Sequence, residues 1–152
     1  MAKVVSVFRV QLPIKAVWSF MSDRTEVGCL FPGCLGVTII DDVDSVWKVR
    51  VTFGPFSKMI DMKTHTTVYK DLEQLSWVGV GDHIRMTGDV FVKKISDNVT
   101  EVTYDMEGHV SGPFSTLQEI VVHEKLREVK KNFIKNIKSE LEWQIDESVD
   151  KK

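Results

Sequence analysis

The sequence predicts an α+β fold, in which a curved antiparallel sheet of six to seven strands wraps around one long C-terminal helix. Apolar and polar residues alternate over residues 3–12 and again from 46 to about 110, which is the spacing of half-buried strands. From 115 to 145 the apolar residues recur at helical spacing. Turn-forming pairs separate the alternating runs at short intervals, so successive strands are expected to pair antiparallel.

The N-terminal part predicts one strand followed by two short helices. The strand over residues 3–12 ends at Pro13, which suits the first turn of a helix over 13–22. A second short helix is expected over 24–31, and the breaker pair Pro32-Gly33 ends it at the corner that leads into the sheet.

The central part predicts about six strands in a meander with one dry face. Polar side chains such as Lys48 and Arg50 occupy the wet phase of these strands. The inward phase holds Trp47, Val49, Val51, Phe53, Met62, Thr64, Thr66, Trp77, Met86, Tyr104 and Met106.

The C-terminal helix presents one apolar stripe. Its lysines alternate with glutamates and are expected to form a solvated face, with peripheral membrane contact as the alternative. The stripe runs through Leu117, Val121, Leu126, Val129, Phe133, Ile137 and Leu141, and the lysines are Lys125, Lys130, Lys131, Lys135 and Lys138. One helix about 10 Å wide cannot cover such a sheet, so the sheet must curl, with glycines such as Gly79, Gly81, Gly88, Gly108 and Gly112 as sites for the bends.

Length, composition and charge narrow the class of protein. The 152 residues suit one domain, expected over residues 1–146, with a fraying tail over 147–152. A net charge of −2 gives no nucleic-acid footprint. No secretion signal precedes the first strand and no apolar run reaches the roughly 18 residues that span a bilayer, so we expect a cytoplasmic protein without a transmembrane anchor.

No catalytic or metal-binding set emerges from the residues. Cys29 and Cys34 stand alone without a nearby histidine, which predicts neither a metal site nor a disulfide. We assign no cofactor, no metal and no catalytic residue, and we expect a protein that is not an enzyme. Tyr104, Thr64 and Thr66 are the inward polar groups, and their hydroxyls are expected to orient a ligand or to bond within the core.

The space under the curled sheet is either a packed core or a ligand cavity, and the sequence leaves both interpretations open. Several inward residues are methionines, whose flexible side chains suit an adaptable pocket and also fill ordinary cores. The candidate lining residues are Phe8, Val10, Met21, Leu30, Phe31, Val37, Trp47, Val49, Val51, Phe53, Met62, Trp77, Met86, Tyr104, Met106, Leu126, Val129 and Phe133.

Short motifs in order along the chain resemble the SRPBCC or helix-grip superfamily, which includes START-related lipid-transfer proteins, and within it the CoxG family of carbon monoxide dehydrogenase. They are Val17-Trp18, Asp23, Pro32-Gly33-Cys34, the run VTFGP from Val51, WVGVG from Trp77, TEVTY from Thr100, Gly112 and Phe133. The likeness spans nearly the whole chain.

The resemblance implies a deep apolar cavity between the sheet and the C-terminal helix, which holds a lipid-, quinone- or polyketide-like molecule. It also implies a link to the assembly of carbon monoxide dehydrogenase or another molybdenum hydroxylase, and hence a metalloenzyme subunit as partner. Fold alone does not fix function. A cavity enzyme of cyclase or hydratase type and a pure protein-interaction module are therefore the alternatives.

Overall fold

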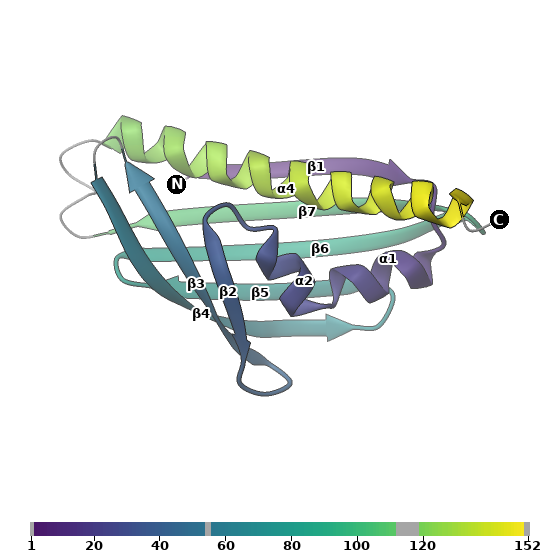
Figure 1. The fold of residues 1–152 in the computed structure, drawn as a ribbon, viewed down its shortest axis with the longest axis horizontal. Coiled ribbons are helices and arrows are strands. Elements are labelled where there is room, and N and C mark those ends of the chain that lie inside the picture. The colour runs from purple at the N-terminus through teal and green to yellow at the C-terminus, as the bar shows by residue number, and fades with distance from the viewer. Residues whose placement is uncertain (1, 54–55, 112–118, 151–152) are drawn as a thin grey trace.

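The computed structural model confirms the predicted fold class: the elements form a sheet of seven antiparallel strands with helices on one face (Figure 1). It describes residues 2–53, 56–111 and 119–150, with side chains for 5–52, 57–111 and 124–142. The elements are β1 (Ala2–Val10), α1 (Ile14–Met21), α2 (Arg24–Cys29), β2 (Cys34–Ile39), β3 (Asp44–Phe53), β4 (Phe56–Lys70), β5 (Gln74–Gly81), β6 (Ile84–Ser96), β7 (Val99–Val110) and α4 (Glu119–Asp150).

The strand order β1-β7-β6-β5-β4-β3-β2 places the first strand of the chain next to the last. α4 runs along β1 and β7, while β2, β3 and β4 cross the view obliquely to the other strands (Figure 1). The sheet is therefore strongly twisted, and its inner face curls toward α4, α1 and α2.

The two short helices begin where local chemistry favours it. The carbonyl of Pro13 accepts hydrogen bonds from Ala16 N and Val17 N at the start of α1. The carboxylate of Asp23 accepts from Thr25 N and Glu26 N, each at 3.1 Å, and so caps α2. These helices sit over the end of the sheet away from the start of α4 (Figure 1).

The glycines of β5 and β6 make room for large side chains instead of bending the strands. The register shifts of the described strands fall at Cys34/Gly36, Thr66/Val68 and Lys94/Ser96. A Cβ at Gly88 would lie 2.4 Å from Trp77 Nε1, and one at Gly79 would lie 2.9 Å from Met62 Sδ. The expectation of glycine bends therefore fails at these positions, and Gly112 lies outside the described residues.

Candidate functional site

Five buried aromatic rings meet in the middle of the inner face, and we call them the aromatic cluster: Phe31, Trp47, Trp77, Tyr104 and Phe133. Ring centroids lie 5.1 Å apart for Phe31 and Phe133, 5.4 Å for Trp47 and Trp77, and 5.8 Å for Tyr104 and Phe133. These separations are those of edge-to-face and tilted aromatic packing. The cluster fills the centre of the space under α4 and separates one cavity from another.

The polar atoms within the cluster largely satisfy one another. Trp77 Nε1 donates a hydrogen bond of 2.9 Å to the Tyr104 hydroxyl. Burial raises the pKa of Tyr104 far above its ordinary value, so the phenol stays neutral. On the inner face nearby, the hydroxyls of Ser45 and Thr64 bond to each other. These hydroxyls serve the core, which leaves them poorly placed as catalytic groups.

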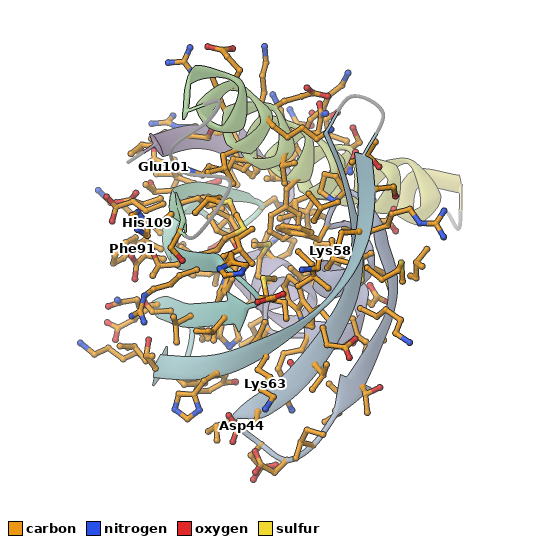
Figure 2. All side chains as sticks on the ribbon, turned by 90° about the vertical axis from the view of Figure 1, so that its left-hand side faces the viewer. Asp44, Lys58, Lys63, Phe91, Glu101 and His109 are labelled. Carbon is orange, nitrogen blue, oxygen red and sulfur yellow. The ribbon has the colours of Figure 1, made fainter. Side chains whose placement is uncertain are left out.

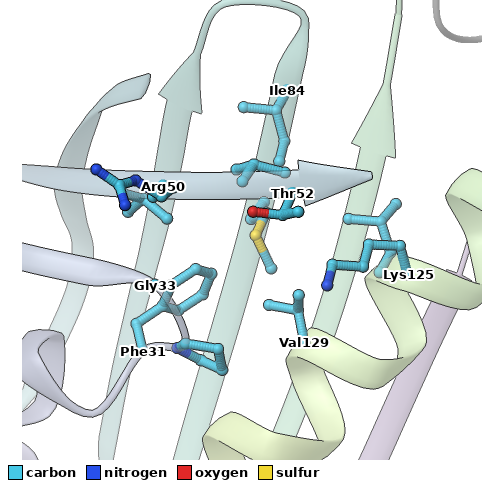
Figure 3. Close-up of a pocket in the computed structure, with 12 residues that line it drawn as sticks. Phe31, Gly33, Arg50, Thr52, Ile84, Lys125 and Val129 are labelled. Atoms are coloured by element: carbon cyan, nitrogen blue, oxygen red, sulfur yellow. The ribbon is translucent and has the colours of Figure 1, made fainter. Parts of the chain in front are cut away.

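A cavity of about 240 Å³ opens at the end of the molecule where α4 starts, and we call it the mouth cavity (Figure 3). Most of its lining side chains are apolar, and they come from β3, β6, α4 and the corner before β2. The lining residues are Phe31, Pro32, Gly33, Val49, Arg50, Val51, Thr52, Ile84, Met86, Lys125, Leu126 and Val129.

The mouth cavity is open because β2 stops short of the end of β3. The last pair between these strands joins Cys34 to Val49. Gly33, with a positive φ of 82°, then turns the chain away, and its carbonyl accepts a 2.8 Å hydrogen bond from Arg50 N. Past Arg50 none of the described strands covers this edge of β3, and the wall that lies across from it is α4.

An ion pair spans the same end of the molecule. Lys58, on the inward phase of β4 and opposite Val51 in register, lies 2.6 Å from a carboxylate oxygen of Asp82 in the turn between β5 and β6. Figure 2 looks onto this end and shows Lys58 directed toward the interior of the curl. The hydrogen bond from Lys58 holds the pKa of Asp82 below its ordinary value.

A second cavity, the inner cavity, lies on the other side of the aromatic cluster, near α1 and α2. Its volume is about 30 Å³, which is the space that one water occupies in the liquid. Its lining residues are Met21, Arg24, Val27, Trp47, Thr64, Thr66, Leu75, Trp77, Val90 and Tyr104. This cavity is too small for an organic ligand while the cluster stays in place.

Comparison with known proteins assigns the family. The model of the CoxG family, which is named for a subunit of carbon monoxide dehydrogenase, matches residues 7–142, and this is most of the chain. The chain belongs to the CoxG family. No curated protein sequence matches it. Among the described residues of this CoxG-family chain, no helix is both long and apolar enough to cross a membrane.

Solved structures at low sequence identity share the fold. A conserved protein from Geobacillus kaustophilus is similar with a TM-score of 0.75 and 17% identity, over 91% of this chain and 94% of that one. A START superfamily protein from Mycobacterium smegmatis has a TM-score of 0.75 and 14% identity, over 95% and 99%. The Zhui aromatase/cyclase from a Streptomyces species has a TM-score of 0.66 and 16% identity, over 94% of each chain. These neighbours confirm the predicted helix-grip fold.

The structure distributes the sequence-predicted lining residues of this CoxG-family chain over several environments. The mouth cavity takes Phe31, Val49, Val51, Met86, Leu126 and Val129. The inner cavity takes Met21, Trp47, Trp77 and Tyr104, and Phe133 joins the aromatic cluster. The packed core holds Val10, Met62 and Met106, while Phe8, Leu30 and Val37 are half-buried against it. The side chain of Phe53 lies outside the described residues.

Sequence reasoning missed the polar part of the mouth cavity. Arg50 and Thr52 occupy the wet phase of β3 and reach the cavity because the strand edge is open there. Lys125 precedes Val129 by one helical turn, which was a usable signal for its position.

Lys130 is a further difference, because it is fully buried instead of solvated. It follows Leu126 by four residues and so falls within the apolar stripe. A Cβ on Gly108 would lie 3.2 Å from its Cε, so its stem packs on β7. Burial lowers the pKa of Lys130, and the charges of Glu107 and Asp105 oppose that shift.

Proposed function

We propose that this protein binds or carries a hydrophobic small molecule and that the mouth cavity is its binding site. The observation that carries the proposal is an apolar-lined cavity that opens at an uncovered strand edge, in a chain of the CoxG family with a START-like fold. Burial of about 200 Å² of apolar ligand surface would contribute about 5 kcal/mol. The cost of association offsets part of that gain, which favours a ligand that is exchanged over one that is permanently held.

The size of the cavity limits what it holds in this conformation. Drug-sized ligands occupy pockets of about 300–1,000 Å³, and the mouth cavity has about 240 Å³. A short or slender apolar group fits as the structure stands. A larger ligand requires Met86 or the aromatic cluster to move, and the thioether side chain of Met86 is suited to such adjustment.

The partner of the carrier, on this proposal, is carbon monoxide dehydrogenase or another molybdenum hydroxylase during assembly in the cytoplasm. The family description supports this link. Affinity capture from cells that express such an enzyme tests it, and the expected result is recovery of a polypeptide of that enzyme with this chain. Capture of the chain alone, from cells in which the enzyme is abundant, would remove the link and leave the binding site untouched.

A cavity enzyme of cyclase or hydratase type finds less support. The similar Streptomyces protein is an aromatase/cyclase, but here the hydroxyls of Tyr104 and Thr64 bond to Trp77 and Ser45 within the core. General acid–base catalysis needs such groups within hydrogen-bond reach of a bound substrate.

Two experiments test the binding function. Organic extraction of purified protein followed by mass spectrometry is expected to find an apolar guest, or an added lipid or quinone is expected to raise the melting temperature. The substitution Val129→Trp fills the mouth cavity and is expected to abolish both effects. Val80→Trp is the matched control, because Val80 is exposed on β5. Full ligand uptake by Val129→Trp, or no ligand across a broad panel, would overturn the proposal.

A further inference from the structure

We propose that the ligand of the mouth cavity is an anionic amphiphile, whose apolar tail packs on the floor of the cavity and whose carboxylate is held at the rim by Lys125 and Thr52. This inference rests on the proposed function and adds the chemical class of the ligand.

The cavity has an apolar floor and a polar rim. The floor is formed by Val49, Val51, Ile84, Met86 and Val129, together with Leu126. The polar side chains come from two elements that face each other across the opening, the uncovered edge of β3 and the first turns of α4. A ligand that matches this division is apolar along most of its length and polar at one end.

Lys125 is directed at the bound ligand instead of at bulk water. Figure 3 shows its amino group turned across the cavity, toward Val129 and toward the strand that carries Thr52. Lys125 is half-buried, and no carboxylate in the described part of the chain lies within ion-pair distance of its amino group. An ammonium group over an apolar wall gains from an anionic partner more than a fully solvated one does.

The charge of the lining has one sign. Arg50 and Lys125 are cationic, and none of the twelve described lining residues is acidic. Lys58 stands at the same end of the molecule, but Asp82 already compensates its charge. Thr52 supplies a hydroxyl, and its backbone groups point to the same side of β3 as Arg50 N, because alternate residues of a strand direct their N–H and C=O groups alike. The rim therefore selects a carboxylate over a neutral or cationic head group.

Three probes with the same tail test this selection: decanoate, 1-decanol and decyltrimethylammonium, each titrated below its micellar concentration by calorimetry. Decanoate is expected to bind roughly tenfold more tightly than decanol, since a hydrogen bond to a charged group is worth about 1.5–3 kcal/mol less the solvent screening of an exposed site. Added salt is expected to weaken decanoate binding and to leave decanol binding unchanged.

Variants of Lys125 separate this inference from the proposed function. Lys125→Gln is expected to lower decanoate affinity to that of decanol, and Lys125→Glu is expected to make decyltrimethylammonium the preferred probe. Lys135→Gln, on an exposed position of the same helix, is the control and is expected to change nothing. Equal binding of all three probes by the unsubstituted protein would overturn the anionic class and keep the cavity as a binding site. Binding of none of them would overturn both proposals.

Discussion

The two ends of the space under α4 have the same backbone architecture and opposite fillings. Near α1 and α2 the large side chains of Trp18, Phe20 and Met21 are buried, and the cavity that remains there has about 30 Å³. At the start of α4 the inward residues are mostly valine and isoleucine, and about 240 Å³ stays open. The topology of the fold therefore does not decide whether its interior is a core or a pocket. Side-chain volume and the length of β2 decide it.

The aromatic cluster stands at the boundary between these ends. Trp47 contacts Phe31, Trp77 and Phe133, and its own exposed fraction is 3%. A ligand longer than the mouth cavity would have to displace these rings. The cluster thus sets the depth to which a ligand enters.

The largest effect is expected from Trp47→Ala, which removes the centre of the boundary. Its free energy of unfolding is expected to fall by about 3–5 kcal/mol, because a large cavity replaces a fully packed ring. The two cavities would then join, and the protein would accept longer tails than before. Urea denaturation and titration with fatty acids of increasing length measure the two consequences. A loss under about 1 kcal/mol would show that the cluster is not the packed boundary described here.

The sequence predicts the sheet well because burial alternates with a period of two. Trp47, Met62 and Met86 all fall on the predicted inward phase and are buried. The division into core and cavity could not be predicted, because phase gives the direction of a side chain and says nothing of whether it meets another. Trp77 fills its place only because Gly88 lies beside it with no Cβ. The open edge depends on where β2 stops pairing, which element boundaries read from sequence do not fix.

A smaller effect is expected from Tyr104→Phe, which leaves Trp77 Nε1 without its acceptor at the packed end. The cost is expected to be about 1–3 kcal/mol at neutral pH, measured by urea denaturation. Decanoate or lipid uptake is expected to be unchanged, because Tyr104 does not line the mouth cavity.

The pH dependence of the same variant gives an independent check. The pKa of Tyr104 is raised by burial in the folded state, so the unfolded chain loses this proton first, near pH 10. The stability that the neutral phenol contributes is complete below about pH 10 and is lost as pH rises toward the folded-state pKa, at up to about 1.4 kcal/mol per pH unit. The difference between the two proteins in urea denaturation should therefore shrink between about pH 9 and 11. A constant difference would mean that the phenol is not buried.

The smallest effect is expected from Ile84→Ala at the open end. Ile84 is half-buried and already borders empty space, so its truncation adds to an existing cavity instead of creating one. The loss in free energy of unfolding is expected to be about 1 kcal/mol, at or below the low end of the range for large-to-small core changes. Its effect on ligand selection should be larger, because a wider floor admits bulkier tails while Lys125 keeps the preference for a carboxylate. A stability loss equal to that of Trp47→Ala would mean that both ends are packed alike and that the contrast between them is wrong.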